Sequence, residues 1–248
     1  MPASPHSVAP SKTTAIIVAA GSSRRMGFNK LTAELLGQPV LRWTLAAFDA
    51  CPDVDDLLVV VGDATRPLVT AWIAEGAFTK PVTLSEGGAE RHLSVHEGLR
   101  KLQADTTIVA VHDGARPLIT RAQISACIAR AREVQAVACA RPVVETLKRV
   151  NAQGVIEGSI PREGAWIMET PQVFDRELLC TAYERVILDG LLVTDEVSAV
   201  QHLGVPVQVQ DNPSPNLKIT YPADLELAAQ LLHGYAGDTR LEDKRQKT

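Results

Sequence analysis

A loop of small and basic residues follows the first strongly apolar run of the chain. It reads GSSRRMGFNK over residues 21–30 and contains Arg25 and Lys30. Small residues after a buried strand allow backbone N–H groups to approach an anion, and the two side chains add positive charge. The small residues that give this access are Ala19, Ala20 and Gly21. The pattern indicates a phosphate-binding loop, and a tight turn with solvated arginines is the alternative.

The segment VHDGARP, residues 111–117, places a carboxylate and a guanidinium three residues apart. Asp113 falls just past an apolar run that predicts a central strand, and ligands of open α/β sheets bind outside the carboxyl ends of strands. A carboxylate there suits Mg²⁺, which binds one or two carboxylates together with phosphate oxygens. Arg116 could hold a phosphate through two N–H groups. A helix-capping aspartate beside a surface arginine is the alternative.

A pair of glycines lies in the segment EGGAERHLS, residues 86–94. Gly87 and Gly88 would allow the backbone to approach a flat base closely, because neither carries a side chain. Ser94 could then hydrogen-bond a ligand from the following helix. A plain turn explains these glycines equally well.

A lysine lies between apolar neighbours in the segment NLKIT, residues 216–220. If Lys218 faces a binding site, its charge would stabilise negative charge that builds on a phosphate. An exposed lysine is the alternative. Other polar residues expected at strand or loop ends are Thr170, Thr194 and Asp195, and either of the last two could be a helix N-cap.

The composition and the remaining motifs exclude several other classes of protein. The net charge is −4 and the pI about 5.9, so the basic excess of a general nucleic-acid binder is missing. Hydrophobic residues make up 46% of the chain, too many for a disordered protein. The sequence lacks a GxGxxG fingerprint, a Walker loop, an HExxH zinc motif and a GxSxG elbow.

The cysteines and the termini bound the organisation of the chain. Four separated cysteines without a CxxC pair indicate reduced thiols and a cytoplasmic protein. Residues 1–12 lack the apolar centre of a secretory signal and are expected to form a disordered leader. We expect a single domain over residues 13–235 and a flexible polar tail over residues 236–248.

Apolar runs alternate with helical patterns along the chain and must position these residues. The predicted strands are Thr14–Ala20, Asp56–Gly62, Pro81–Leu84, Thr107–His112, Ala136–Ala140, Thr146–Val150 and Val205–Gln210. The predicted helices are Pro39–Ala50, Glu90–Leu102, Thr120–Arg132, Glu177–Asp189, Asp195–Leu203 and one from Pro222 through Leu232. Continuous apolar runs are typical of strands covered on both faces. The alternation predicts a doubly wound, mostly parallel α/β sheet.

One stretch interrupts this alternation. Residues 141–172 contain two β-like pieces, VVETLKRV and GVIEGSI, joined by NAQG. This pattern predicts a β-hairpin inserted into the α/β fold, over about residues 141–168. A hairpin of this length would bury little against its own domain. A surface flap and an arm that contacts a partner subunit are both open.

Six motifs in order resemble the 2-C-methyl-D-erythritol 4-phosphate cytidylyltransferase family of the non-mevalonate isoprenoid pathway. The motifs are AAGSSRRMGFNK, GGAERHLSV, VHDGARP, ETPQVF, TDEVSAV and NLKITYPADLELA. They span roughly Thr14 to Leu232. The motif VHDGARP is nearly confined to this family and its ribitol phosphate relatives. Sugar nucleotidyltransferases share only the first loop.

The resemblance implies a homodimer that uses Mg²⁺ or another divalent cation and transfers a cytidylyl group from CTP to methylerythritol phosphate, with release of pyrophosphate. It implies that Asp113 binds the metal and that Arg25, Lys30 and Lys218 surround the α-phosphate as catalytic residues. The implied CTP pocket is lined by Ala19, Ala20, Gly21, Gly88, Ser94, Asp113 and Gly114. The implied acceptor site has Arg116, Thr170 and Thr194, and the partner's hairpin brings Thr146 and Arg162.

Three positions depart from the family pattern. Ala89 and Glu145 each stand where many members carry Asp, and Pro215 stands where some members have a second acidic metal contact. None of these departures removes a cation, so the expected activity is kept. Alternatives are a ribitol phosphate cytidylyltransferase, a non-catalytic CTP-binding regulator and a hexose-1-phosphate uridylyl- or guanylyltransferase. The regulator would be expected to lack Lys30, Asp113 or Lys218.

Overall fold

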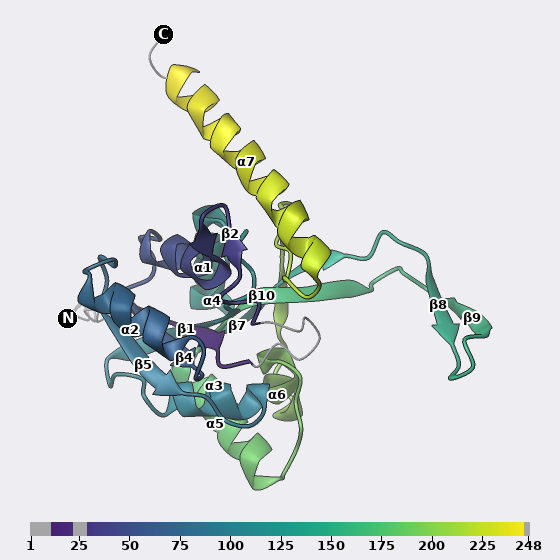
Figure 1. Cartoon of the computed structure of the whole chain (residues 1–248). Coiled ribbons are helices and arrows are strands. Elements are labelled where there is room, and N and C mark those ends of the chain that lie inside the picture. Colours follow the sequence, from purple (N-terminus) through teal and green to yellow (C-terminus); the bar gives the residue numbers. More distant parts are fainter. Residues whose placement is uncertain (1–10, 22–28, 246–248) are drawn as a thin grey trace, which may run out of the picture.

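A seven-stranded sheet forms the centre of the described part of the chain. The computed structural model describes residues 11–21 and 29–245, with side chains as far as His233. The strands are β1 (Lys12–Ala19), β4 (Asp56–Val61), β5 (Val82–Glu86), β6 (Thr106–Asp113), β7 (Ala136–Pro142), β10 (Trp166–Asp175) and β11 (Gln208–Asp211). They lie in the order β11-β7-β10-β6-β1-β4-β5 (Figure 1).

Six of these strands point the same way. The pairs β1–β4, β1–β6, β4–β5 and β7–β11 are parallel, whereas β10 runs antiparallel to both β6 and β7. A separate two-residue pair, β2 (Glu34–Leu35) with β3 (Gln38–Pro39), precedes the first helix. The predicted mostly parallel α/β sheet is confirmed, with one reversed strand inserted at its centre.

Helices cover both faces of the sheet. They are α1 (Val40–Asp49), α2 (Arg66–Ala74), α3 (Arg91–Leu99), α4 (Arg121–Val134), α5 (Arg176–Leu188), α6 (Glu196–His202) and α7 (Pro222–Arg245). Successive side chains of a strand point to opposite faces. Ile17 of β1 therefore packs in the core beneath α1, α2 and α4, while Ile16 packs beneath α3, α5 and α6. This arrangement explains why β1 is apolar at consecutive positions.

Four elements were missing from the sequence-based prediction: the short strands β2 and β3, strand β10 and helix α2. Strand β10 carries Pro171, and a proline within an apolar run argues against a central strand. The structure accommodates it because the β10–β7 pairing is irregular between Met168 and Gln172. Helix α2 begins with a proline in its first turn, at Pro67. By contrast, the capping box of Thr120 and Gln123 at the start of α4 is confirmed.

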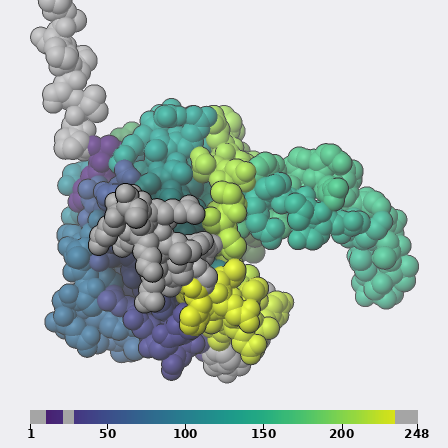
Figure 2. Space-filling model, turned by 90° about the horizontal axis from the view of Figure 1, so that it is seen from above, coloured from purple at the N-terminus to yellow at the C-terminus, as the bar shows by residue number. Residues whose placement is uncertain are grey.

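The predicted hairpin is present as β8 (Leu147–Val150) and β9 (Ile156–Ile160), which pair only with each other. It stands clear of the body of the chain, connected through the ends of β7 and β10 (Figures 1 and 2). All five residues of β9 are exposed. The packing of this hairpin within its own chain is therefore confined to its two strands.

Helix α7 runs away from the body and continues to Arg245 (Figure 1). Its inner part packs Ala228 against Leu35 and Leu118. The helical backbone thus extends into residues 236–245, so the predicted flexible tail is wrong for this stretch. The stretch contains Leu, Glu, Lys and Arg, which favour helix. Most of the predicted leader, residues 1–10, lies outside the described residues. None of the described helices is both long and apolar enough to span a membrane.

Candidate functional site

The loops after β1, β4, β5 and β6 meet at one edge of the sheet, because these parallel strands all end there. The loops touch closely. The Gly87 N–H donates to the Val61 carbonyl at 3.0 Å, and a Cβ added at Gly87 would overlap the Cβ of Ala20. Glycine at position 87 is therefore required by the close approach of two loops.

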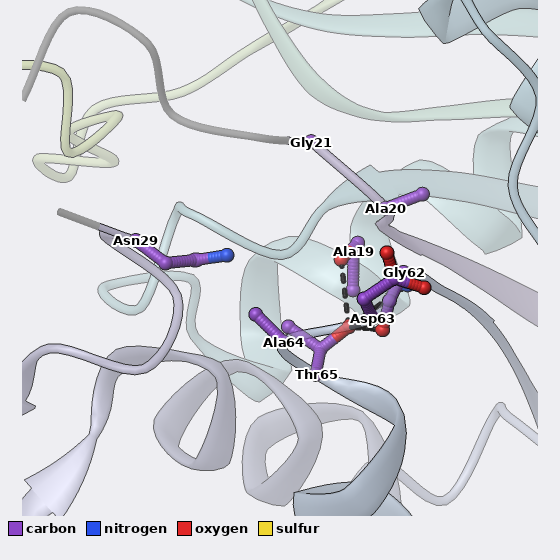
Figure 3. Close-up of a pocket in the computed structure, with 8 residues that line it drawn as sticks. All are labelled: Ala19, Ala20, Gly21, Asn29, Gly62, Asp63, Ala64 and Thr65. Atoms are coloured by element: carbon purple, nitrogen blue, oxygen red, sulfur yellow. Dashed lines mark hydrogen bonds between the residues drawn. The ribbon is translucent and has the colours of Figure 1, made fainter.

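A pocket of about 330 Å³ opens between the ends of β1 and β4 (Figure 3). The Thr65 hydroxyl holds these two strand ends together, since it donates to the Ala19 carbonyl at 2.9 Å and accepts from the Gly62 N–H at 3.1 Å. No motif in the sequence indicated a role for Gly62 or Thr65. The pocket is lined by Ala19, Ala20, Gly21, Asn29, Gly62, Asp63, Ala64 and Thr65.

Asp113, the last residue of β6, lies at the centre of a cluster of cations. Its Oδ1 accepts from Arg91 Nε at 3.1 Å, and its Oδ2 accepts from Lys218 Nζ at 2.7 Å. Arg116 Nε lies 3.8 Å from the same Oδ2. The fold thus brings together Asp113, Arg116 and Lys218, which sequence reasoning had selected from segments a hundred residues apart, and adds Arg91.

The cations decide the charge of Asp113. Burial raises the pKa of its carboxyl group, but Arg91, Lys218 and Arg116 outweigh burial and hold that pKa well below its usual range. The neighbouring His112 behaves oppositely, because burial and the charges of Arg116 and Lys218 outweigh the attraction of Asp113 and lower the pKa of His112 to about 3. The cluster at neutral pH therefore holds one ionised carboxylate and one neutral imidazole.

A second carboxylate, Glu196, holds Arg91 from the other side. Arg91 Nη1 and Nη2 donate to the two oxygens of Glu196 at 2.8 and 3.2 Å. Tyr183 donates its hydroxyl to Glu196 Oε1 at 3.0 Å. The Glu196 side chain is fully buried at the first turn of α6. Arg91 and Glu196 lie within the motifs GGAERHLSV and TDEVSAV, yet residue type alone did not pair them.

The residues around Arg116 retain unused polar atoms. Arg116 donates from Nη1 to the Asn216 carbonyl at 2.7 Å, and Asn216 Nδ2 donates to the Thr170 carbonyl at 2.7 Å. The Thr170 hydroxyl accepts from the Asp113 N–H at 3.1 Å. Among the described residues, the buried Arg116 Nε and Asn216 Oδ1 have no hydrogen-bond partner. Both atoms are shielded from solvent, and Arg116 Nε lies 3.8 Å from Asp113 Oδ2, beyond hydrogen-bond distance.

Two predicted ligand contacts are already engaged within the chain. The Gly114 N–H donates to the Val18 carbonyl at 3.0 Å and continues the sheet. The Ser94 hydroxyl accepts from the Gly88 N–H at 3.1 Å and donates to the Glu90 carbonyl at 3.0 Å. Ser94 therefore fixes the loop after β5, and Gly88 and Ser94 form one unit beside the sheet edge.

The remaining predicted residues lie in three other places along the chain. Arg25 lies outside the described residues, and Lys30 follows that part of the loop in a turn. Thr146 and Arg162 flank the projecting hairpin, where Arg162 Nη1 donates to the Val144 carbonyl at 2.7 Å. Thr194 is exposed, and the N-cap of α6 is Asp195, whose side chain accepts from the Ser198 N–H.

The donor set limits how a metal could bind. The described residues contain no group of three or more His, Cys, Asp or Glu side chains placed to hold a metal ion. Within the cation cluster, the cations around Asp113 keep its carboxylate ionised. This donor set fits Mg²⁺ that shares its coordination with phosphate oxygens, and it does not fit a cage made of protein ligands alone. The cluster as a whole can hold polyanions and a divalent cation.

Comparison with protein families places nearly the whole chain within one of them. Residues 13–234 match the model of the family described as 2-C-methyl-D-erythritol 4-phosphate cytidylyltransferase. The protein of that name from Desulforamulus reducens is 39% identical over 221 residues, which cover 88% of this chain and 94% of the relative. The one from Symbiobacterium thermophilum is 42% identical, covering 88% and 91%.

Solved structures agree with this match. The crystal structure of 4-diphosphocytidyl-2C-methyl-D-erythritol synthase from Anaerococcus prevotii has a TM-score of 0.80 and 26% identity, covering 90% of this chain and 99% of that one. The 2-C-methyl-D-erythritol 4-phosphate cytidylyltransferase of Francisella tularensis has a TM-score of 0.75 and 27% identity, covering 89% and 100%.

Proposed function

The chain belongs to the 2-C-methyl-D-erythritol 4-phosphate cytidylyltransferase family, and from that premise we propose which of its residues perform the reaction. The protein is a nucleotidyltransferase that transfers CMP from CTP to methylerythritol phosphate in isoprenoid precursor biosynthesis. An oxygen of the acceptor phosphate forms a new bond to the α-phosphorus of CTP, and the bond from that phosphorus to pyrophosphate breaks. The ribitol phosphate alternative is not supported by the names of these relatives.

The observation that carries the assignment of roles is the cation cluster around Asp113. The acceptor phosphate is already a nucleophile at neutral pH, so the reaction needs placement and charge neutralisation more than it needs a base. Lys218 and Arg116 are basic groups at the carboxyl ends of the strands, within reach of the same Asp113 oxygen. Lys30 and Arg25 follow β1 in the sequence and would add charge from the other side of this edge.

We assign the α-phosphate to Lys218, Lys30 and Arg25, and the acceptor phosphate to Arg116, Thr170 and Thr194. The position of Arg116 supports its role, because its guanidinium group brings positive charge beside Asp113. Thr170 lies beside Asp113 through the hydrogen bond of its hydroxyl. The small residues Ala19, Ala20 and Gly21, with the Gly88–Ser94 unit and Gly114, would border CTP.

Asp113 would hold the divalent cation together with phosphate oxygens of CTP. The ion, when bound, would neutralise phosphate charge and help to orient the reacting groups. The chain supports it by keeping the Asp113 carboxylate ionised, since the surrounding cations lower the pKa of that group well below its usual range. Pro215 provides no carboxylate, which is consistent with a site that relies on one protein ligand.

The hairpin β8–β9 would form a homodimer arm. Its apolar side chains are exposed in the single chain, including Val150, Val155 and Ile156. Exposed apolar side chains gathered on one projecting element are typical of an interface. Dimerisation would also explain why Thr146 and Arg162 flank the hairpin, since the partner's active site would then receive them.

We also propose a cytoplasmic location, which is supported by four free cysteines, three of them buried.

Pyrophosphate release with Mg²⁺ and CTP tests this function directly, with methylerythritol phosphate and ribitol phosphate compared as acceptors. We expect release with methylerythritol phosphate and much less with ribitol phosphate. Release only with ribitol phosphate would keep the mechanism and change the acceptor. No release with either acceptor, from a protein that still binds CTP, would contradict the catalytic assignment and would favour a CTP-binding regulator.

A further inference from the structure

We infer that Glu196 is a positioning residue, which acts through Arg91 to fix the orientation of the Asp113 carboxylate. This inference rests on the proposed role of Asp113 as the metal ligand. Glu196 belongs to α6, and its two oxygens contact Arg91 and not Asp113; one of them also accepts from Tyr183. Its influence on Asp113 therefore passes through a single guanidinium group.

The geometry of Arg91 makes this influence specific. A guanidinium group is planar, with its N–H groups in a fixed fork, so two parallel bonds to one carboxylate set the plane of the whole group. Glu196 takes both Nη atoms, and Nε then points to Asp113 Oδ1 at 3.1 Å. Arg91 cannot turn about its bond to Asp113 without losing a bond to Glu196.

Because Arg91 holds one oxygen of Asp113, the two oxygens of this carboxylate have different partners. Oδ1 is held by Arg91, whereas Oδ2 faces Lys218 at 2.7 Å and Arg116 at 3.8 Å. Oδ2 is thus the oxygen on the side of the predicted phosphate-binding cations. By holding Oδ1, the Arg91–Glu196 pair would keep Oδ2 turned toward the groups that meet the substrates.

Stability alone does not account for Glu196. Its side chain is fully buried and that of Arg91 is three-quarters buried, and an ion pair taken out of water often adds little net stability compared with apolar residues. The Tyr183 hydroxyl completes the shell of Glu196 from α5. Partners that orient a metal ligand typically change metal affinity or activity about 10–100-fold when they are removed.

The test measures how much Mg²⁺ strengthens CTP binding in the full-length protein. Calorimetric titration with CTP is carried out once with Mg²⁺ and once with EDTA, and the ratio of the two dissociation constants is the readout. In the Glu196→Gln variant we expect this ratio to fall at least about 10-fold, with CTP affinity in EDTA changed less than about 2-fold. Gln keeps the shape of the side chain but offers Arg91 no charge and one fewer acceptor oxygen.

Two further variants separate positioning from folding. Tyr183→Phe removes one hydrogen bond to Glu196 and keeps the charge, and we expect a fall of about 2–5-fold in the ratio. Val186→Ala, on the same face of α5 and fully buried, destabilises the same core without touching the ion pair, so it should leave the ratio unchanged. Circular dichroism establishes that each variant is folded. If Glu196→Gln does not fold, the Tyr183→Phe ratio decides.

The outcomes distinguish this inference from the proposal beneath it. An unchanged ratio in folded Glu196→Gln, or in Tyr183→Phe where that variant decides, overturns the positioning role while leaving Asp113 as the metal ligand. A fall as large in Val186→Ala also overturns it, because the effect would then be structural. If Asp113→Asn keeps the wild-type ratio, the metal role of Asp113 fails and the inference fails with it.

Discussion

The cluster around Asp113 is buried and contacted by several elements, whereas the hairpin β8–β9 is exposed and pairs only with itself. Asp113 has only a tenth of its side chain exposed and is contacted by groups from α3, from the loop after β6 and from the segment before α7. The hairpin pairs with itself and exposes every residue of β9. The first region is completed by its own chain, and the second offers an apolar surface that its own chain does not cover.

Substitutions in the two regions should therefore affect different properties of the protein. A charge removed from the cluster should change chemistry, because the neighbouring groups are fixed by several hydrogen bonds and lose a partner. A side chain changed on the hairpin should leave the fold of its own chain intact and change association instead.

Lys218→Ala should have the largest effect. Lys218 Nζ lies 2.7 Å from Asp113 Oδ2, and removing one group that stabilises transition-state charge typically lowers the rate about 10²–10³-fold. Steady-state pyrophosphate release would measure this fall. Lys12→Ala is the matched control, since Lys12 pairs with Asp56 and Asp105 near the start of β1 and should keep its rate. Near wild-type turnover in Lys218→Ala would contradict the assigned role.

Ile156→Asp should weaken the homodimer and spare the fold. Ile156 is 62% exposed in the single chain, so an aspartate there meets water in the monomer. Burial of an Ile side chain in an interface is worth roughly 1.5–3 kcal/mol, and replacing it by a charge should lower association at least about 10-fold. Analytical ultracentrifugation would measure this shift.

The body of the chain offers a control for the hairpin. Ile73 on α2 is also exposed, at 37%, and Ile73→Asp should leave the oligomeric state unchanged. If Ile156→Asp remains a dimer at the same concentrations, the hairpin is not the interface. If it unfolds as a monomer, the hairpin is part of the core after all, and the contrast between the two regions is lost.

Gly87→Ala should destabilise the protein by about 1–3 kcal/mol, the usual cost of forcing extra atoms into a packed region. The new Cβ would overlap the Cβ of Ala20, so the loops after β1 and β5 must separate. Urea unfolding would measure the loss. Gly158→Ala on β9 is the matched control, because its added Cβ meets nothing within 4 Å. Equal stability of both variants would contradict the tight junction at the sheet edge.

Much of this contrast could be predicted from the sequence, and for physical reasons. Continuous apolar runs such as TAIIVAA predicted strands covered on both faces, which Ile16 and Ile17 confirm. The hairpin followed from turn residues between two β-like pieces. Asp113 was found because ligands of open α/β sheets bind past the carboxyl ends of strands, Arg116 because it lies three residues further on, and Lys218 because it lies between apolar neighbours.

The rest depended on tertiary contacts that no local pattern reveals. Strand β10 was missed because Pro171 argues against a strand, and only the irregular pairing with β7 makes room for it. Glu196 could not be paired with Arg91, since 105 residues separate them and each looks like an ordinary surface residue. The place of Thr65 in the pocket likewise depends on tertiary contacts. Its hydroxyl donates to the Ala19 carbonyl and accepts from the Gly62 N–H, and so bridges two strands.

Lowering the pH from 7 to 5.5 should reduce the free energy of unfolding by about 1 kcal/mol through His112. This is the smallest of the predicted effects. Burial, with Arg116 and Lys218 nearby, lowers the pKa of His112 to about 3, although Asp113 acts in the opposite direction. An unfolded histidine has a pKa near 6.5, so between these values the unfolded state binds more protons than the folded state. Stability from the neutral, buried His112 is therefore present above pH 6.5 and is lost progressively as the pH falls toward 3.

Urea unfolding in EDTA at several pH values would measure how steeply the free energy of unfolding changes with pH. In His112→Gln, which has no group to protonate at this position, the slope between pH 7 and 5.5 should be smaller than in the wild type. Equal slopes would mean that His112 takes up its proton as readily in the folded cluster as in water, and that the cluster is more open to solvent than its contacts indicate.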